Sequence, residues 1–155
     1  MHVLEKEITL DAPKAKVWEF LATPLNLNEL TPPSLEFKII SELPDKMYNG
    51  LMIQYEIRIP MFGTHRWLTE IKHIHDGVSF VDEQRIGPYK LWYHQHTIES
   101  VTDCQTRMID RVTYQMPFGP LGLLVRKVKV SQMLEEIFDY RTKCLYEIFG
   151  KGSPR

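Results

Sequence analysis

Two segments of this chain place polar, chemically active side chains where an ordinary strand would present apolar ones. In the first segment, every second residue gives the series Trp92, His94 and His96, and in the second the same spacing includes Asp110 and Tyr114. Side chains of a strand point to opposite faces with a period of two, so one face of each segment mixes apolar groups with imidazole, carboxylate and phenol. Each of these polar groups needs a partner when buried. A core that only needed packing would avoid them, and the pattern therefore predicts a hollow core that receives a ligand.

Four polar residues of these segments could form an acid–base site. A histidine paired with Asp110 could act as a general base held by its orienting carboxylate. The Tyr114 hydroxyl could donate a hydrogen bond to a carbonyl oxygen and stabilise an enolate, as aldol-type cyclisation or dehydration requires. The same groups could instead contact a ligand without chemistry, or form an internal hydrogen-bonded network. All three alternatives stay open, and the candidate catalytic residues are His94, His96, Asp110 and Tyr114.

The two histidines also raise the question of a metal ion. Histidines two positions apart on a strand can reach one ion, and Asp110 or another carboxylate could be a third ligand. A structural zinc site usually needs four ligands, and a catalytic one needs three plus water. His65 and His73 could share a face with Trp67, but their depth does not follow from the sequence. We predict no metal and no organic cofactor, and whether the paired histidines bind an ion stays open.

Apolar and aromatic residues of several segments are predicted to line the pocket. Such side chains wall most small-molecule sites, although an ordinary core has the same composition. The candidate ligand-binding residues are Tyr55, Trp67, Trp92, Met108, Val112, Met133, Ile137, Phe138 and Arg141. Arg141 interrupts an otherwise apolar stripe. Its guanidinium either holds an anionic group of a ligand or pairs with Asp82, Glu83 or Asp110. The facing of Asp82, Gln84 and Arg85 is not fixed, because the Gly87-Pro88 break after them could include a bulge.

The elements that position these residues follow from the periodicity of the chain. A helix at about 13–22 and a short helical turn within 24–33 follow the first strand. From about 125 to 149 the apolar period changes from two to near 3.6, which predicts a long amphipathic helix. Strands are predicted at 2–9, 35–43, 50–60, 63–74, 78–85, 90–101 and 105–116. We predict an α+β fold in which a curved antiparallel sheet of about seven strands wraps around the C-terminal helix, with two short helices between strands 1 and 2.

This order resembles the helix-grip fold of the START-like (SRPBCC) superfamily, and the resemblance covers essentially the whole chain. In detail it is similar to small bacterial cyclase/dehydrase-like proteins. The residues that carry it are Gly87-Pro88, Trp92-x-His94-x-His96, Asp110 with Tyr114, Pro117-Phe118-Gly119 and Ile137-Phe138-Asp139-Tyr140-Arg141. One departure lies at 103–106, where similar chains often have a glycine-rich turn. The superfamily includes polyketide cyclases and dehydrases, lipid-transfer domains and ligand carriers. The resemblance therefore implies a ligand cavity without deciding between enzyme and carrier.

Length and composition limit the remaining alternatives. The 155 residues suffice for one domain with a real core, and we predict a single ligand-binding domain over 1–150 with a disordered tail at 151–155. A formal net charge of −1 favours neither nucleic acid nor an anionic membrane as partner. Cys104 and Cys144 have no metal-ligand spacing, and no apolar run approaches the ~20 residues of a membrane span. We expect a reduced, cytoplasmic protein without membrane insertion, as a monomer or homodimer.

The expected function is binding of a hydrophobic or aromatic small molecule, lipid or polyketide-like, between the sheet and the C-terminal helix. The alternative is a cofactor-independent cyclase or dehydratase that uses a His/Asp acid–base pair in the same cavity. A further alternative is a non-enzymatic regulatory or interaction module. The sequence leaves open whether the protein is an enzyme.

Overall fold

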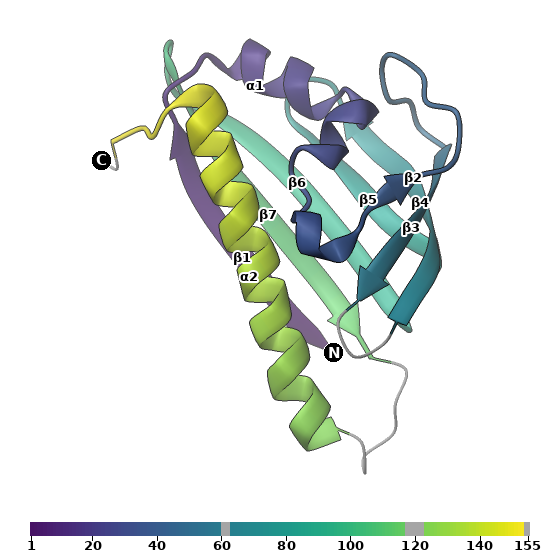
Figure 1. Cartoon of the computed structure of the whole chain (residues 1–155). Helices are drawn as coiled ribbons and strands as arrows, with labels where there is room; N and C mark the ends of the chain where they lie inside the picture. Colours follow the sequence, from purple (N-terminus) through teal and green to yellow (C-terminus); the bar gives the residue numbers. More distant parts are fainter. Residues whose placement is uncertain (60–62, 117–122, 154–155) are drawn as a thin grey trace.

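The fold is one seven-stranded antiparallel sheet with a long helix packed across its concave face (Figure 1). The computed structural model describes residues 1–59, 63–116 and 123–153, the last range with side chains from Val130 onward. The elements are β1 (His2–Leu10), α1 (Lys14–Leu21), η1 (Pro24–Asn28), η2 (Pro33–Leu35), β2 (Lys38–Ile39), β3 (Leu51–Ile59), β4 (Gly63–His75), β5 (Ser79–Ile86), β6 (Leu91–Thr102), β7 (Gln105–Gln115) and α2 (Leu123–Phe149). This confirms the predicted α+β helix-grip architecture.

The order of strands in the sheet explains where the short helices lie. The order is β1-β7-β6-β5-β4-β3-β2, so the strands from β2 to β7 are consecutive neighbours while β1 pairs with β7. The chain between β1 and β2 must therefore cross from one edge of the sheet to the other. This crossing segment, which contains α1, η1 and η2, covers the part of the concave face beside α2 (Figure 1).

Helix α2 buries one stripe of side chains against the sheet. Buried positions recur three or four residues apart, as one face of an α-helix requires. These residues are Val130, Leu134, Phe138, Arg141 and Leu145. Four of them are apolar, and the exception, Arg141, lies near the middle of the sheet.

The predicted strand at 35–43 is wrong in most of its length. The chain forms the 3-10 helix η2 up to Leu35 and then turns at Glu36, whose φ of 43° lies in the left-handed region. A strand cannot begin before that turn ends. Only Lys38 and Ile39 pair with β3, opposite Glu56 and Tyr55.

The end of the chain also differs from the expectation of a disordered tail from residue 151. Lys151 forms a β-bridge with Leu10, and the Gly152 N–H donates to the Thr9 carbonyl at 2.9 Å. A Cβ at Gly152 would lie 2.6 Å from Cγ2 of Thr9, so this close approach requires glycine. The contacts dock the segment after α2 onto the end of β1.

Buried apolar side chains form two clusters along the same concave face. One, which we call the packed end, lies under α1 and the last turns of α2. The packed end contains Leu10, Val17, Ile98, Met108 and Leu145, each no more than 1% exposed. The other, which we call the cavity end, contains the aromatic residues of β3, β4 and β6 together with Leu134 and Phe138.

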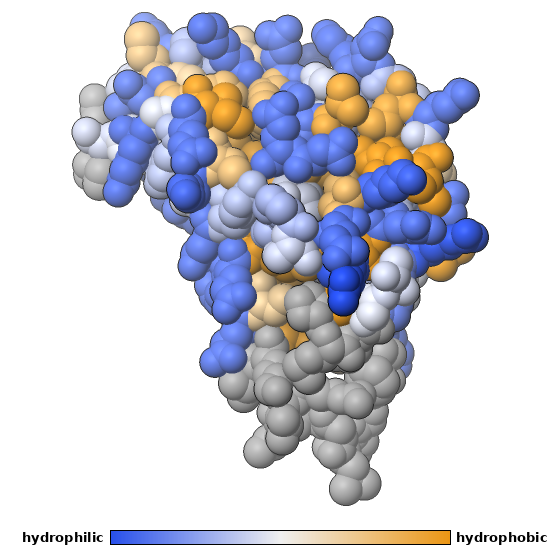
Figure 2. Space-filling view, in the orientation of Figure 1, coloured by the Kyte–Doolittle hydropathy of each residue, from blue (hydrophilic) through white to orange (hydrophobic). Residues whose placement is uncertain are grey.

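The outer surface is mostly polar on the side seen in Figure 2. Apolar groups gather in the upper right of that view, where Figure 1 shows the crossing segment and β2. Leu25 of η1 and Ile40 after β2 are among the exposed apolar residues, at 62% and 41%. Along the part of the chain that the structure describes, no helix has the length and apolar character needed to cross a membrane.

Candidate functional site

A cavity of about 180 Å³ lies at the cavity end, between the sheet, α2 and the crossing segment. An apolar cavity of ~150 Å³ can hold benzene, so this space suits a group the size of about one aromatic ring. The predicted site residues that line the cavity are Tyr55, Trp67, Trp92, His94, His96, Met133, Ile137, Phe138 and Arg141. They come from β3, β4, β6 and α2, which explains why no single segment of the sequence describes the site.

Four predicted site residues lie elsewhere, as far as the described lining goes. Met108 belongs to the packed end and Val112 to the core beneath the cavity. Asp110 is buried behind the lining, and Tyr114 packs against Tyr89 and hydrogen-bonds Ser131 of α2. The structure thus places Val112, Asp110 and Tyr114 in the support of the cavity and Met108 in the packed end. The predicted turn Pro117-Phe118-Gly119 lies outside the described residues.

One wall of the cavity is aromatic. Trp67 stacks on Tyr55 with ring centroids 5.8 Å apart, and meets Trp92 edge-on at 5.4 Å. The Tyr55 hydroxyl contacts Oγ1 of Thr69 at 3.3 Å, and burial holds the pKa of this phenol well above its ordinary value. The wall is therefore neutral, and its polar atoms contribute orientation rather than charge.

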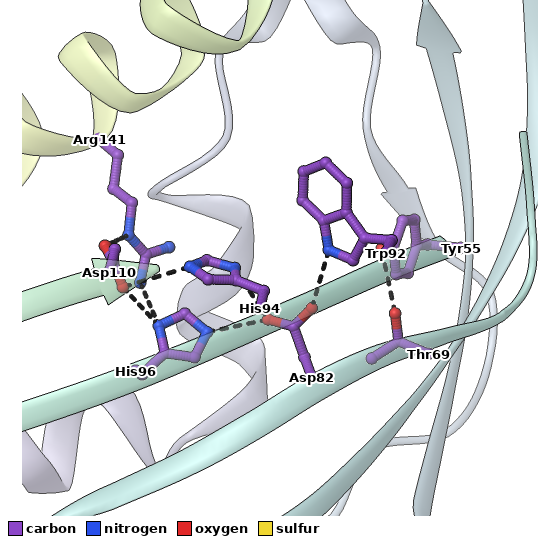
Figure 3. Close-up of polar contacts among 8 residues, drawn as sticks. All are labelled: Tyr55, Thr69, Asp82, Trp92, His94, His96, Asp110 and Arg141. Atoms are coloured by element: carbon purple, nitrogen blue, oxygen red, sulfur yellow. Dashed lines mark hydrogen bonds and ion pairs between the residues drawn. The ribbon is translucent and has the colours of Figure 1, made fainter. Parts of the chain in front are cut away.

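Next to the aromatic wall lies a group of ionisable side chains, which we call the ionic cluster: Asp82, His94, His96, Asp110 and Arg141 (Figure 3). Strand pairing creates it. His94 lies opposite Asp82 across β5–β6, and His96 lies opposite Asp110 across β6–β7. Directly opposite side chains on one face of an antiparallel pair lie close together, so the register alone brings two imidazoles between two carboxylates.

Each carboxylate faces both imidazoles. His96 bridges them, with Nδ1 2.6 Å from Oδ1 of Asp110 and Nε2 2.8 Å from Oδ2 of Asp82. His94 lies beside it at a ring distance of 3.8 Å, with Nδ1 3.1 Å from Asp82 Oδ2 and Nε2 3.3 Å from Asp110 Oδ1. Outside this ring of four groups, Arg141 Nε donates to Asp110 at 3.0 Å. Trp92 Nε1 donates to Oδ1 of Asp82 at 3.2 Å.

For three of these groups, the effect of charge pairing on the pKa outweighs the effect of burial. Burial alone would raise the pKa of Asp82, but the charges and hydrogen bonds of His94 and His96 hold that pKa well below its ordinary value. Burial also opposes ionisation of Asp110, whose pKa is held low chiefly by Arg141. Burial would lower the pKa of His94, but the two carboxylates raise it to about 9. At neutral pH the two carboxylates therefore face an imidazolium and a guanidinium.

Two members of the ionic cluster have unused capacity. The Nε2 atom of His94 is buried and makes no hydrogen bond within the described part of the chain, since its 3.3 Å contact with Asp110 is an ion pair only. The Asp82 side chain is 21% exposed and lines the cavity, so it offers accessible surface to that space. Asp82 is the carboxylate that a bound molecule would meet.

The sequence did not place Asp82 in the site, because the facing of β5 could not be derived. The Gln84 side chain explains the break at Gly87-Pro88. It accepts from the Tyr89 N–H at 3.1 Å and donates to the Tyr89 carbonyl at 2.7 Å. A Cβ at Gly87 would lie 2.4 Å from Gln84 Oε1, so a larger residue there would displace the Gln84 side chain from this position. Arg85 points outward and pairs with Glu70 and Glu83. The alternation of Phe80 with Asp82 was the available signal.

Comparison with known proteins identifies the fold. No protein-family model and no curated protein matches this chain. Solved structures do: protein CV1439 from Chromobacterium violaceum superposes with a TM-score of 0.72 at 14% identity, covering 98% of this chain and 100% of that one. A START superfamily protein from Mycobacterium smegmatis gives 0.67 at 10% identity, with 96% and 97% covered.

An enzyme is also among the similar structures. The Zhui aromatase/cyclase of a Streptomyces species superposes with a TM-score of 0.63 at 16% identity, covering 92% of this chain and 87% of that one. The TM-scores of these superpositions establish a shared fold. The chain therefore has the START-like helix-grip fold that the sequence resemblance implied.

Proposed function

We propose that this protein binds a small, largely apolar molecule in the cavity between the sheet and α2. The observation that carries the proposal is a cavity of about 180 Å³ whose lining joins an aromatic wall to the ionic cluster. Small-molecule sites combine an apolar lining with a few convergent polar groups in this way. A START superfamily protein among the similar structures supports the same reading.

The volume and the accessible polar atoms narrow the ligand class. The cavity suits a ring-sized group, and a longer chain would have to extend toward the crossing segment. The carboxylate of Asp82 already accepts from Trp92 and His96 and forms an ion pair with His94. An ionised carboxylate has about four acceptor positions, so one remains for the ligand. We infer a ligand that carries a hydroxyl or another hydrogen-bond donor on its ring.

The charge states favour binding over acid–base turnover. A general base works best with a pKa near the working pH. The carboxyl groups of Asp82 and Asp110 have strongly lowered pKa values, which makes them weak bases. His94, with a pKa of about 9, is an imidazolium at neutral pH and has no lone pair to accept a proton. The same groups are well suited to orienting a polar ligand.

A second candidate function is cofactor-independent cyclisation or dehydration. His94 supports it, because an imidazolium that lines the cavity could stabilise negative charge developing on a carbonyl oxygen or protonate a leaving hydroxyl. The aromatase/cyclase among the similar structures supports it as well. In this candidate His94 is the acid.

Native mass spectrometry of the purified protein, compared with a denatured and solvent-extracted sample, tests the proposal. We expect a small molecule that stays bound in the native sample and is released on denaturation. Ile53→Phe places extra volume in the cavity and should abolish retention, whereas Ile98→Val changes the packed end and should not. A bare chain mass, together with no binding of added phenol, would contradict the proposal.

A further inference from the structure

We propose that Asp82, His94 and His96 form a binding site for a divalent transition-metal ion at the polar wall of the cavity. Their potential ligand atoms all lie within 4.8 Å of one another. Two imidazoles and one carboxylate are ligands that zinc and iron(II) accept in sites with open positions. The site needs no organic ligand, and it stands independently of the function proposed above.

The three ligand atoms converge on one small region. Nδ1 of His94 and Nε2 of His96 lie 3.1 Å and 2.8 Å from the same atom, Oδ2 of Asp82. Metal–ligand bonds of about 2.0–2.1 Å in a tetrahedral site place neighbouring ligand atoms roughly 3.3 Å apart. An ion would therefore need Asp82 to withdraw by only about half an ångström, and it would displace to solvent the protons that the two imidazole nitrogens hold toward Asp82. Both imidazoles already point toward that region (Figure 3).

The surroundings of the three residues already supply the outer contacts that metal ligands need. A metal-bound histidine usually donates its other ring N–H to a carboxylate. Asp110 provides this carboxylate for His96, 2.6 Å from its Nδ1, and forms an ion pair with Nε2 of His94 at 3.3 Å. Arg141 fixes Asp110, and Trp92 fixes the other oxygen of Asp82.

The cavity gives an ion access to the site. All three ligands line the cavity, and Asp82 has accessible surface toward it. Asp110 lies behind them, which makes it an orienting group rather than a ligand. An ion held here would have its remaining coordination positions open to water or to a polar atom of a bound molecule. The sequence indicated the two histidines but not this third ligand, because Asp82 is on β5, whose facing could not be derived.

Cobalt(II) is the probe for the test, since a tetrahedral or five-coordinate site gives it intense visible absorption. Equilibrium dialysis of wild-type protein should show one bound Co²⁺ per chain, with these bands, and Zn²⁺ should displace it. Asp82→Asn and His96→Gln should each weaken binding by about 100-fold or more, because each removes a ligand. Asp110→Asn should weaken it by about 10–100-fold, as for other outer-contact residues.

Surface imidazoles provide the matched control. The double variant His73→Asn/His75→Gln removes two exposed histidines and should leave stoichiometry and spectrum unchanged. Circular dichroism and thermal melting without metal show which variants fold. If His96→Gln does not fold, the isosteric Asp82→Asn alone decides whether the ligands are correctly assigned. The proposal is overturned if wild type binds no Co²⁺, if Asp82→Asn binds it as tightly as wild type, or if the surface variant loses it.

Discussion

The packed end and the cavity end are built from the same strand faces. The side chains change from apolar to ionisable between one inward-facing cross-strand pair and the next. On β6 and β7 the inward cross-strand pair Ile98–Met108 belongs to the packed end, and the next inward pair is His96–Asp110. On α2, Leu145 lies over the first pair and Arg141, one turn earlier, pairs with Asp110 of the second. Apolar packing and buried ion pairing thus adjoin within one helical turn.

The ionic cluster has a cost in desolvation free energy, and it provides a polar wall that the packed end lacks. At the packed end the five apolar side chains named above are no more than 1% exposed. At the cavity end the charges need partners, and desolvation offsets much of their attraction. We infer that these groups are present because they hold a polar wall beside an open space, which apolar residues could not do.

Removing the guanidinium should have the largest effect. Arg141→Met leaves the buried Asp110 carboxylate without its main cation, and we expect a loss of about 3–5 kcal/mol in the free energy of unfolding, measured by urea denaturation. Lys143→Met is the control on the same helix. Lys143 makes only an exposed contact with Glu147 at 3.8 Å, so the change should be under about 0.5 kcal/mol. Equal effects of the two substitutions would show that the ionic cluster adds nothing to the free energy of unfolding.

The next effect concerns apolar volume. Leu145→Ala at the packed end should cost about 3 kcal/mol, because it opens a new hole among fully buried side chains. Ile137→Ala at the cavity end should cost clearly less, about 1–2 kcal/mol, because this side chain already borders an existing space and has fewer contacts to lose. Urea denaturation of both variants measures the difference. Similar losses would mean that the cavity is filled in solution.

The pH dependence of stability separates the two ends as well. His94 has a folded pKa of about 9 against an ordinary 6.5, so its protonation stabilises the metal-free protein fully below pH 6.5. This contribution should be lost as the pH rises from 6.5 through 9, with a total of up to about 3 kcal/mol. His94→Gln should flatten this alkaline slope, whereas the exposed His75→Gln should keep it. Urea midpoints between pH 6 and 10 measure both.

Acid should act through the carboxylates in the opposite direction. The pKa values of Asp82 and Asp110 are lowered on folding, so their stabilisation is present above the unfolded pKa near 3.8 and is lost as the pH falls through the folded values. Stability should therefore be greatest between about pH 4 and 6.5. The double variant Asp82→Asn/Asp110→Asn tests this: if it keeps the wild-type acid slope, other groups cause it.

A single hydrogen bond at the packed end should have the smallest effect. Thr106 is fully buried and its hydroxyl donates to the Ala12 carbonyl at 2.8 Å. Thr106→Val should cost about 1–2 kcal/mol, since the carbonyl is left without this donor. Thr102→Val in the exposed turn removes the acceptor for the Cys104 N–H and should cost less. Thermal melting measures the stability loss of both variants. A larger loss for Thr102→Val than for Thr106→Val would contradict the role given to the buried hydrogen bond.

Most of the fold could be predicted because its elements have clear periods. The alternation in β6 and β7 is uninterrupted, which correctly oriented His94, His96 and Asp110 inward. The segment 35–43 failed because a left-handed turn at Glu36 does not alter the apolar pattern. Asp82 could not be placed because strand pairing, rather than its own segment, decides its facing. A site formed by five charged groups from four elements depends on register, which periodicity alone does not specify.

The most direct test of the ligand cavity uses the three tryptophans. The indole N–H groups of Trp67 and Trp92 belong to residues that line the cavity, while Trp18 lies outside it and donates to Asp76 near the surface. A titration of ¹⁵N-labelled protein with phenol, followed by NMR, reports on all three at once. We expect saturable shifts of the Trp67 and Trp92 indole signals and an unchanged Trp18 signal. No shift at Trp67 and Trp92, or an equal shift at all three, would contradict a ligand-binding cavity at this end of the molecule.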